Sequence, residues 1–218
     1  MSIEGSRGVK TVRAAARVFI GRSTPQYLTA SVVVLMVGRV LLGGFGWRDA
    51  VVAVVLVAIQ PFVEWIIHVR VLHAIPRMRR GRLFDPGASH RAHHEDPWNL
   101  DVQFFDLSRI VAGQIFFGVL FLVLFQRWSV VLTGVLVATV LSFYYEWIHF
   151  FTHTAYWPKT RYYRDVWRAH RLHHFRNENY WHGITNTIAD RLLGTFPKKQ
   201  EVPLSPTARL LDGGDQET

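Results

Sequence analysis

The chain has 218 residues, half of them apolar and 14% aromatic, with a mean hydropathy of +0.12 and a net charge of +9. It contains no cysteine, which excludes disulfide scaffolds, thiolate nucleophiles and iron–sulfur clusters, so any metal must be bound by imidazole, carboxylate or water. The basic residues flank long apolar blocks, and this distribution favours a membrane protein over a nucleic-acid-binding module.

Residues 1–24 form a basic arm in which apolar side chains recur close to helical spacing. The arm carries Arg7, Lys10, Arg13, Arg17 and Arg22. We expect an amphipathic helix that lies on an anionic membrane face. A cleaved signal peptide is the competing interpretation, and it is disfavoured because no small-residue cleavage site follows the apolar run 27–46.

Four apolar segments are candidates to cross a bilayer, which takes about 20 residues. They are 28–45, 50–67, 110–125 and 130–151, and the first is the weakest because Arg39 and several glycines interrupt it. Short turns at 46–49 and 126–129 join them in pairs, so the sequence predicts two helical hairpins. Lys and Arg concentrate in the arm, in 74–108 and after Lys159. We therefore expect both termini and the histidines between these segments on the cytoplasmic side.

The histidines gather in four clusters, on or at the ends of expected helices. A spacing of i, i+3, i+4, which occurs twice, puts three imidazoles on one narrow helical face. One pair is five residues apart, or about 140° around a regular helix, so its members need a wider fan or a local distortion to share a metal, or they serve different metals. Ten imidazoles are too many for one ion, and two ions with about five ligands each fit the count. The ten candidate ligands are His68, His73, His90, His93, His94, His149, His153, His170, His173 and His174.

The clusters of the two halves of the chain match in register. Four histidines have a partner 80 positions later, and His68 is matched by His149 at 81. This spacing predicts an internal pseudo-repeat of a hairpin followed by a His-x-x-His-His helix. A coincidence of spacing is the alternative, since the residues between the histidines barely match.

Simpler explanations apply to one histidine better than to ten. A single histidine on a helix face is more often a packing or surface residue, and a metal-buffering tract is of low complexity, unlike these spread clusters.

Glu64 and Glu146 lie one helical turn before a candidate ligand and, with Asp190, are candidates to orient the ligand histidines by hydrogen bonds. Ion pairs with nearby arginines are the alternative for these acids. The role of His182, outside the clusters, stays open between ligand, ligand support and substrate pocket.

With these residues in view, the sequence resembles the fatty acid hydroxylase superfamily, which also contains sterol desaturases. The resemblance covers about 50–197 and rests on the four histidine motifs, on Asn179-Tyr180-Trp181-His182-Gly183-Ile184-Thr185-Asn186 through Asp190, and on Gly194-Thr195-Phe196-Pro197. The four residues between His68 and His73 look more like the fatty acid 2-hydroxylase branch than the sterol desaturase branch.

The resemblance implies an all-α fold, in which a four-helix integral membrane base of two helical hairpins carries a cytosolic helical cap with a dinuclear metal site. The ten histidines would be the ligands of two metal ions, assigned as iron in the family, with zinc as the alternative in purified protein. The chemistry would take place at the metals with O2 and two electrons, so no catalytic side chain is named. The basic arm is far too short for a fused cytochrome b5 domain. We therefore expect a separate electron donor, ferredoxin-like or cytochrome b5-like.

The predicted function is hydroxylation of a C–H bond in a lipid or fatty acyl substrate. One alternative is desaturation, or sterol or carotenoid oxidation, at the same site. The other is a non-enzymatic membrane metal-binding or transport protein, which is disfavoured because the clusters lie at helix ends. The expected organisation is the arm 1–24, a membrane hydroxylase domain 25–202 and a disordered tail 203–218, with no nucleic-acid partner.

Overall fold

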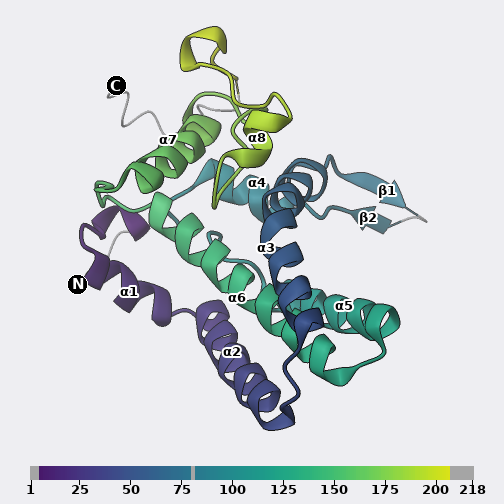
Figure 1. Ribbon diagram of the computed structural model, residues 1–218. Coiled ribbons are helices and arrows are strands. Elements are labelled where there is room, and N and C mark those ends of the chain that lie inside the picture. Colours follow the sequence, from purple (N-terminus) through teal and green to yellow (C-terminus); the bar gives the residue numbers. More distant parts are fainter. Residues whose placement is uncertain (1–4, 80–81, 207–218) are drawn as a thin grey trace. The chain divides into compact units, whose positions relative to one another are not determined.

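The computed structural model describes residues 5–79 and 82–206, and Figure 1 shows the elements in chain order. The chain divides into two compact units. Unit 1 contains the described residues of Met1–Ala15, Pro61–Gln103 and Ile148–Thr218, and unit 2 contains Ala16–Gln60 and Phe104–Trp147. Helices α1, α3 and α6 contribute residues to both units.

The described part of the chain is mainly helical, as predicted. Its α-helices are α1 Val12–Ile20, α2 Ser23–Leu42, α3 Trp47–Ile67, α4 Ala88–Glu95, α5 Leu107–Phe125, α6 Trp128–Thr152, α7 Arg161–Phe175 and α8 Ile188–Leu192. A π-helical turn, His68–Leu72, continues α3, and 3₁₀ turns span Gly5–Gly8 and Lys199–Glu201. Between the π-helical turn and α4 the chain also holds an antiparallel hairpin of β1 Arg77–Arg79 and β2 Arg82–Phe84.

Four helices are long and apolar enough to cross a membrane: Ser23–Leu42, Trp47–Leu72, Leu107–Phe125 and Trp128–Thr152. They correspond to the four predicted spans, with turns at 43–46 and 126–127. Many of their apolar side chains are exposed, and Leu41 reaches 82%. Apolar surface of this extent is consistent with an integral membrane protein.

The predicted disordered tail falls mostly on 207–218, which lie outside the described residues. The preceding residues, 203–206, are held against the end of α7. The Ser205 N–H donates to the Arg176 carbonyl (2.8 Å), and the Asn177 amide donates to the Pro203 carbonyl (3.2 Å).

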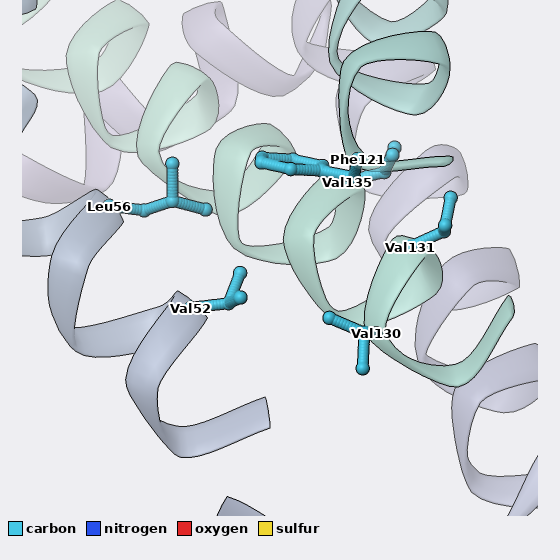
Figure 2. Close-up of a cluster of buried hydrophobic side chains, with 6 residues drawn as sticks. All are labelled: Val52, Leu56, Phe121, Val130, Val131 and Val135. Carbon is cyan, nitrogen blue, oxygen red and sulfur yellow. The ribbon is translucent and has the colours of Figure 1, made fainter. Parts of the chain in front are cut away.

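Unit 2 is built around an apolar contact between three of the candidate spans. Val52 and Leu56 of α3, Phe121 of α5, and Val130, Val131 and Val135 of α6 form its buried cluster (Figure 2). A Cβ on Gly134 would overlap the Phe121 ring, so glycine at this position allows α5 and α6 to approach closely.

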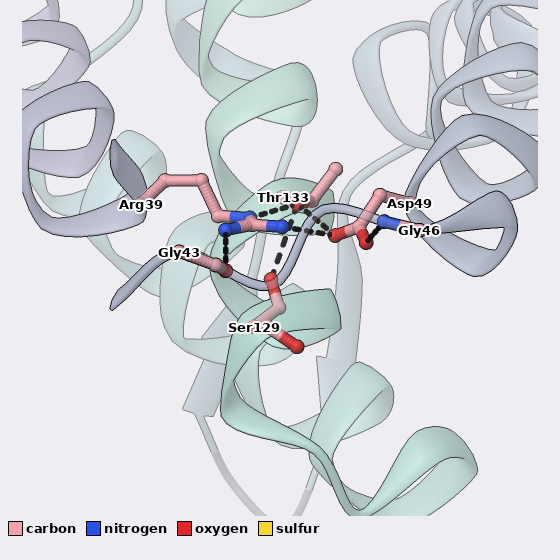
Figure 3. A network of polar contacts seen from close by, with 6 residues as sticks. All are labelled: Arg39, Gly43, Gly46, Asp49, Ser129 and Thr133. Atoms are coloured by element: carbon pink, nitrogen blue, oxygen red, sulfur yellow. Dashed lines mark hydrogen bonds and ion pairs between the residues drawn. The ribbon is translucent and has the colours of Figure 1, made fainter. Parts of the chain in front are cut away.

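Arg39, which made the first predicted span the weakest, is buried in a polar network at the end of α2 (Figure 3). Its guanidinium donates to Asp49 Oδ1 (2.9 Å), to Thr133 Oγ1 (2.7 Å) and to the Gly43 carbonyl (2.6 Å). Asp49 in turn accepts from the Gly46 N–H (2.9 Å). The charge is therefore paired and hydrogen-bonded, which is the condition under which an ionisable side chain is tolerated in an apolar helix.

Candidate metal centre

All ten candidate histidines lie in unit 1, on four short stretches of chain. The first stretch ends α3 in the π-helical turn, where the His73 N–H donates to the His68 carbonyl (3.0 Å). An i→i+5 bond brings residues five apart onto one side of the helix. Of the alternatives that the spacing of His68 and His73 left open, the structure therefore has the local distortion, with both residues in one cluster.

The next stretch is α4, which begins directly against the end of the π-helical turn. A Cβ on Gly87 would overlap the Leu72 carbonyl oxygen, so the approach requires glycine. The close start of α4 brings His90 Nε2 within 3.0 Å of His68 Nε2 and 3.2 Å of His73 Nε2.

The second half of the site comes from the end of α6 and from α7. The Thr160 side chain caps α7 by accepting from the Tyr163 N–H (3.2 Å), which fixes where the helix begins. Helix α7 therefore begins at Arg161 and carries the second His-x-x-His-His motif. Its inward face buries His170, His173 and His174.

The structure gathers the ten histidines into two groups of five, and each group could hold a metal ion. Within each group, one ring nitrogen from every histidine lies within 4.8 Å of the others. The first cluster contains His68, His73, His90, His94 and His173. The second cluster contains His93, His149, His153, His170 and His174.

Each His-x-x-His-His helix is divided between the clusters. On α4, His90 and His94 face the first cluster and His93 the second. On α7 the assignment is reversed, with His173 in the first cluster. The outer pair of each motif is about 40° apart around a helix, whereas the middle histidine lies about 60° to the other side. One helix can therefore supply both clusters.

The nitrogen separations suit ligands of one ion. In the first cluster, His94 Nε2 lies 3.1 Å from His90 Nε2 and 3.2 Å from His173 Nε2. In the second, His153 Nε2 lies 3.1 Å from His93 Nε2 and 2.8 Å from His170 Nε2. Two nitrogens bound at right angles to one ion, each at about 2.0–2.1 Å, would be ~3 Å apart.

Backbone carbonyls fix the tautomer of three of the histidines. The Nδ1–H of His68 donates to the His182 carbonyl (2.5 Å), that of His149 to the Gln103 carbonyl (3.0 Å), and that of His173 to the Tyr180 carbonyl (2.8 Å). A carbonyl can only accept, so these rings carry their proton on Nδ1 and a lone pair on Nε2. The Nε2 lone pair is the one that a metal would use.

His174 gives a direct test of whether the site fits a metal. A neutral imidazole has one N–H donor and one lone pair. Both ring nitrogens of His174 are buried, and among the described residues neither has a hydrogen-bond partner. A buried nitrogen without a partner lowers the stability of the fold, and a metal bound to the lone pair of His174 would give that nitrogen a partner. The residues present therefore fit a metal.

Burial also keeps the imidazoles neutral, which metal binding requires. Desolvation, together with the neighbouring rings, lowers the pKa of His90, His93, His153, His170 and His173 well below the usual range. Burial lowers the pKa of His73 to about 4. These rings would present lone pairs at neutral pH.

Two of the three predicted supporting acids, Glu64 and Asp190, hold the loop that carries the accepting carbonyls of Tyr180 and His182. Glu64 accepts from the N–H groups of Ile184 and Thr185 and from the Thr185 hydroxyl. Asp190 accepts from the N–H groups of His182 (2.9 Å) and Gly183 (2.7 Å).

Glu146 belongs to unit 2. It accepts from the Phe105 N–H (3.0 Å), two residues after the carbonyl of Gln103.

The accepting carbonyls themselves could not be read from the sequence. Gln103, Tyr180 and His182 take part through the backbone, which leaves no signal in the identity of the side chain. The only hint was the segment 179–190 that resembled the family. Trp181 packs into this segment, with its N–H donating to the Thr195 carbonyl (2.9 Å).

These features define a class: a helical protein with four candidate membrane spans and a buried centre of ten histidines that could hold metal. The fatty acid hydroxylase family model matches residues 53–195, and the chain belongs to this family. The match begins in α3 and ends after α8, so it includes all ten histidines. No curated protein and no solved structure matches the chain.

Proposed function

We propose that the chain is a membrane-bound oxygenase that hydroxylates a C–H bond of a lipid or fatty acyl substrate. The observation that carries the proposal is the pair of five-histidine clusters, buried side by side in a chain with four candidate membrane spans. Membership of the fatty acid hydroxylase family supports the reaction class.

In this proposal the ten histidines hold two metal ions, one in each cluster, and iron is the metal that suits the chemistry. Imidazole nitrogens suit iron and zinc alike. When bound, the ions would supply the redox chemistry with O2 that no amino-acid side chain can provide. One oxygen atom would enter the C–H bond and the other would leave as water, with two electrons from a separate donor protein and two protons from the solvent.

The chain's own residues prepare the ligands for this role. The carbonyls of His182, Gln103 and Tyr180 keep the protons of three rings on Nδ1. Glu64 and Asp190 fix the loop that holds two of these carbonyls, so we propose that they orient the ligands indirectly. Burial of the clusters keeps water away and removes the cost of reorganising solvent during the reaction.

We further propose that both termini and the clusters face the cytoplasm. The distribution of Lys and Arg supports this sidedness, because few of them lie in the turns at 43–46 and 126–127. A cytoplasmic site would be accessible to a soluble electron donor.

The test is expression of the full chain in a host that lacks it, followed by lipid mass spectrometry and metal analysis of the purified protein. We expect a lipid that has gained one oxygen atom, and its loss in His170→Ala. The exposed Asp165 on the same helix gives a matched control, Asp165→Asn, which should retain product and metal.

A lipid product that has lost two hydrogen atoms would show that the site desaturates its substrate and does not hydroxylate it. Retention of both metal and product by His170→Ala would refute the proposed centre. Gradient-driven metal exchange in proteoliposomes, without lipid oxidation, would point to transport in place of catalysis.

A further inference from the structure

The 3₁₀ turn Gly5–Gly8, at the start of the basic arm, packs against the loop that follows α4. The Ser6 N–H donates to the Trp98 carbonyl (2.9 Å), and the Ser6 hydroxyl donates to the same carbonyl (3.4 Å). A Cβ on Gly5, whose φ is 56°, would overlap this carbonyl oxygen, so the approach requires glycine. The Arg7 guanidinium lies over the Trp98 ring, 3.7 Å from its centroid. Ser6 is completely buried, so the turn is an integral part of unit 1.

The Ser6 hydroxyl also receives a hydrogen bond from the far end of this loop. The side-chain amide of Gln103 donates to Ser6 Oγ (2.7 Å) and to the Pro97 carbonyl. A carbonyl can only accept, so the amide nitrogen is the atom that lies between these two partners. The hydroxyl therefore accepts from Gln103 and donates to Trp98. One buried oxygen atom of the arm thus connects the two ends of the loop 97–103.

The same Gln103 orients a candidate metal ligand through its backbone. Its carbonyl accepts from the Nδ1–H of His149 (3.0 Å), while its side chain is held by Ser6 and Pro97. Rotation of the backbone at Gln103 would break the side-chain bonds, so the carbonyl has little freedom to turn away from the imidazole. The direction of the Nε2 lone pair of His149 therefore depends on the contact with Ser6.

The first cluster is supported by other means. Its matching ligand, His68, donates to the carbonyl of His182 (2.5 Å), and the N–H of His182 is held by the Asp190 carboxylate (2.9 Å). These three residues lie within 53–195, the range that the family model matches. Ser6 lies outside this range. The second cluster therefore takes part of its support from the N-terminal arm, which the histidine motifs do not contain.

We propose that Ser6 and Gln103 are positioning residues of the second cluster. Together they fix the carbonyl that keeps the proton of His149 on Nδ1 and directs its Nε2 at the metal. The inference rests on the proposed function, in which one ion binds in each cluster. It gives the N-terminal arm a role in metal binding in addition to the membrane contact that its basic residues predict.

The metal affinity of each cluster, measured separately, tests this inference. In the purified, metal-stripped full chain in detergent, one cluster at a time is disabled by the removal of two of its ligands. His68→Ala/His73→Ala leaves the second cluster intact, and His153→Ala/His170→Ala leaves the first. Competition between a chelator and the protein for Zn²⁺ then gives the affinity of the remaining site.

Ser6→Ala and Gln103→Leu should each lower the Zn²⁺ affinity of the second site about tenfold, the lower end of the range for the loss of a group that orients a ligand. The affinity of the first site should stay unchanged. The double variant Ser6→Ala/Gln103→Leu should lose no more than either single variant, because both changes remove the same hydrogen bond.

A second measurement reports on His149 without any metal. In the metal-free chain labelled with ¹⁵N-histidine, the proton resonance of His149 Nδ1–H, assigned by its loss in His149→Ala, should move upfield in both variants because its hydrogen bond weakens. Gln103→Leu changes the other partner of the bond to Ser6, so it is read alone if Ser6→Ala does not fold.

Thr11→Ala is the matched control in the same arm. The Thr11 hydroxyl accepts from the Ala14 N–H (3.1 Å) and so caps α1, without contact to the loop 97–103. Its removal should weaken the start of α1 and leave the Zn²⁺ affinity of both sites and the His149 resonance unchanged.

Unchanged second-site affinity and an unchanged His149 resonance in both variants would overturn the positioning role alone. An equal loss of affinity at both sites would also overturn it, because the turn would then stabilise unit 1 as a whole. Wild-type protein that binds fewer than two Zn²⁺ ions would overturn the proposed dinuclear function, and the His149 resonance of the metal-free chain would still decide the positioning role. The two failures are therefore distinguishable.

Discussion

His94 and His174 stack face to face, with ring centroids 4.1 Å apart and an interplanar angle of 18°. They occupy the same position in the two His-x-x-His-His helices, and each belongs to a different cluster. When every histidine of the first cluster is replaced by its partner in the other half of the chain, the second cluster results. In this operation His173, which comes from the second half, is replaced by His93 from the first half. The stack therefore marks the centre of a pseudo-twofold relationship within one chain.

Because His93 and His173 each belong to the cluster formed mainly by the other half of the chain, double variants should lose metal in a specific pattern. His93 and His90 are on one helix but in different clusters, whereas His93 and His149 are far apart in sequence but in one cluster. We expect His93→Ala/His149→Ala to lose one of the two ions. His93→Ala/His90→Ala should lose both, because each cluster loses a ligand. Metal content per chain, measured by mass spectrometry, checks both.

The same variants provide their own control. Two substitutions in one cluster should be strongly non-additive in metal affinity, since the first already disables the site, while substitutions in different clusters should add. Equal metal loss in the two double variants would contradict the division of each helix between the clusters.

Much of this centre could be predicted from the sequence because histidine spacing reports directly on helix geometry. The i, i+5 pair left a wider fan, a distorted helix or two different metals as alternatives, and the π-helical turn at His68–Leu72 is the distortion among them. The four apolar runs predicted the four candidate spans, because length and hydropathy are properties of the sequence itself. Boundaries moved by a few residues where polar Ser23 and Thr24 continue α2 at its start.

The division between clusters could not be predicted, because it depends on how α4 and α7 pack and not on either helix alone. The carbonyl groups that accept hydrogen bonds from His68, His149 and His173 could not be predicted either. They are backbone atoms of loops, so the identity of the side chain does not reveal them. The polar network around Arg39 also escaped prediction. It satisfies the charge through Asp49 and through Thr133, which is 94 residues from Arg39.

Asp190 should be needed both for stability and for metal retention. Asp190→Ala would remove the acceptor of the His182 and Gly183 N–H groups and of the Thr195 hydroxyl. Each buried group left unsatisfied costs about 1–3 kcal/mol, so we expect a loss of at least about 2 kcal/mol of unfolding free energy. Metal affinity should fall about 10–100-fold, because the loop positions the carbonyl that orients His68.

Thermal unfolding in detergent and competition with a chelator measure these two effects. Asp165→Ala on the exposed face of α7 is the control and should change stability by less than about 0.5 kcal/mol. An Asp190 variant that is destabilised but binds metal as tightly as the wild type would show that the loop has no influence on the ligands.

The metal-free protein should lose stability on acidification. Burial lowers the pKa of His73 to about 4 in the folded state, and it lowers the pKa of His90, His153 and His170 well below the usual range. The unfolded chain binds protons below a pH of about 6.5, where these folded-state rings remain neutral. Stability should therefore be constant above about pH 7 and fall as the pH drops from 6.5 toward 4.

Each such histidine contributes a slope of about 1.4 kcal/mol per pH unit within that window. The midpoint of urea unfolding, measured from pH 8 to pH 4.5, checks the trend. The variant His73→Phe should show a shallower slope than the wild type. A midpoint that rises on acidification would contradict the sign of the lowered pKa values.

The Arg39 network should stabilise unit 2 without affecting the metal centre. Arg39 has 1% of its surface exposed, and Asp49 is buried beside it. Arg39→Met would leave the Asp49 carboxylate buried without its partner, which typically costs about 3–5 kcal/mol. The double variant Arg39→Met/Asp49→Leu should recover much of that loss, because an apolar pair carries no desolvation penalty.

Arg48→Met, at an exposed position one residue before Asp49, is the control and should have little effect. Thermal unfolding in detergent measures the stability, and metal content should stay at the wild-type value because all ten histidines lie in unit 1. A double variant less stable than Arg39→Met alone would show that the carboxylate contributes through Thr133 and Gly46 independently of the arginine.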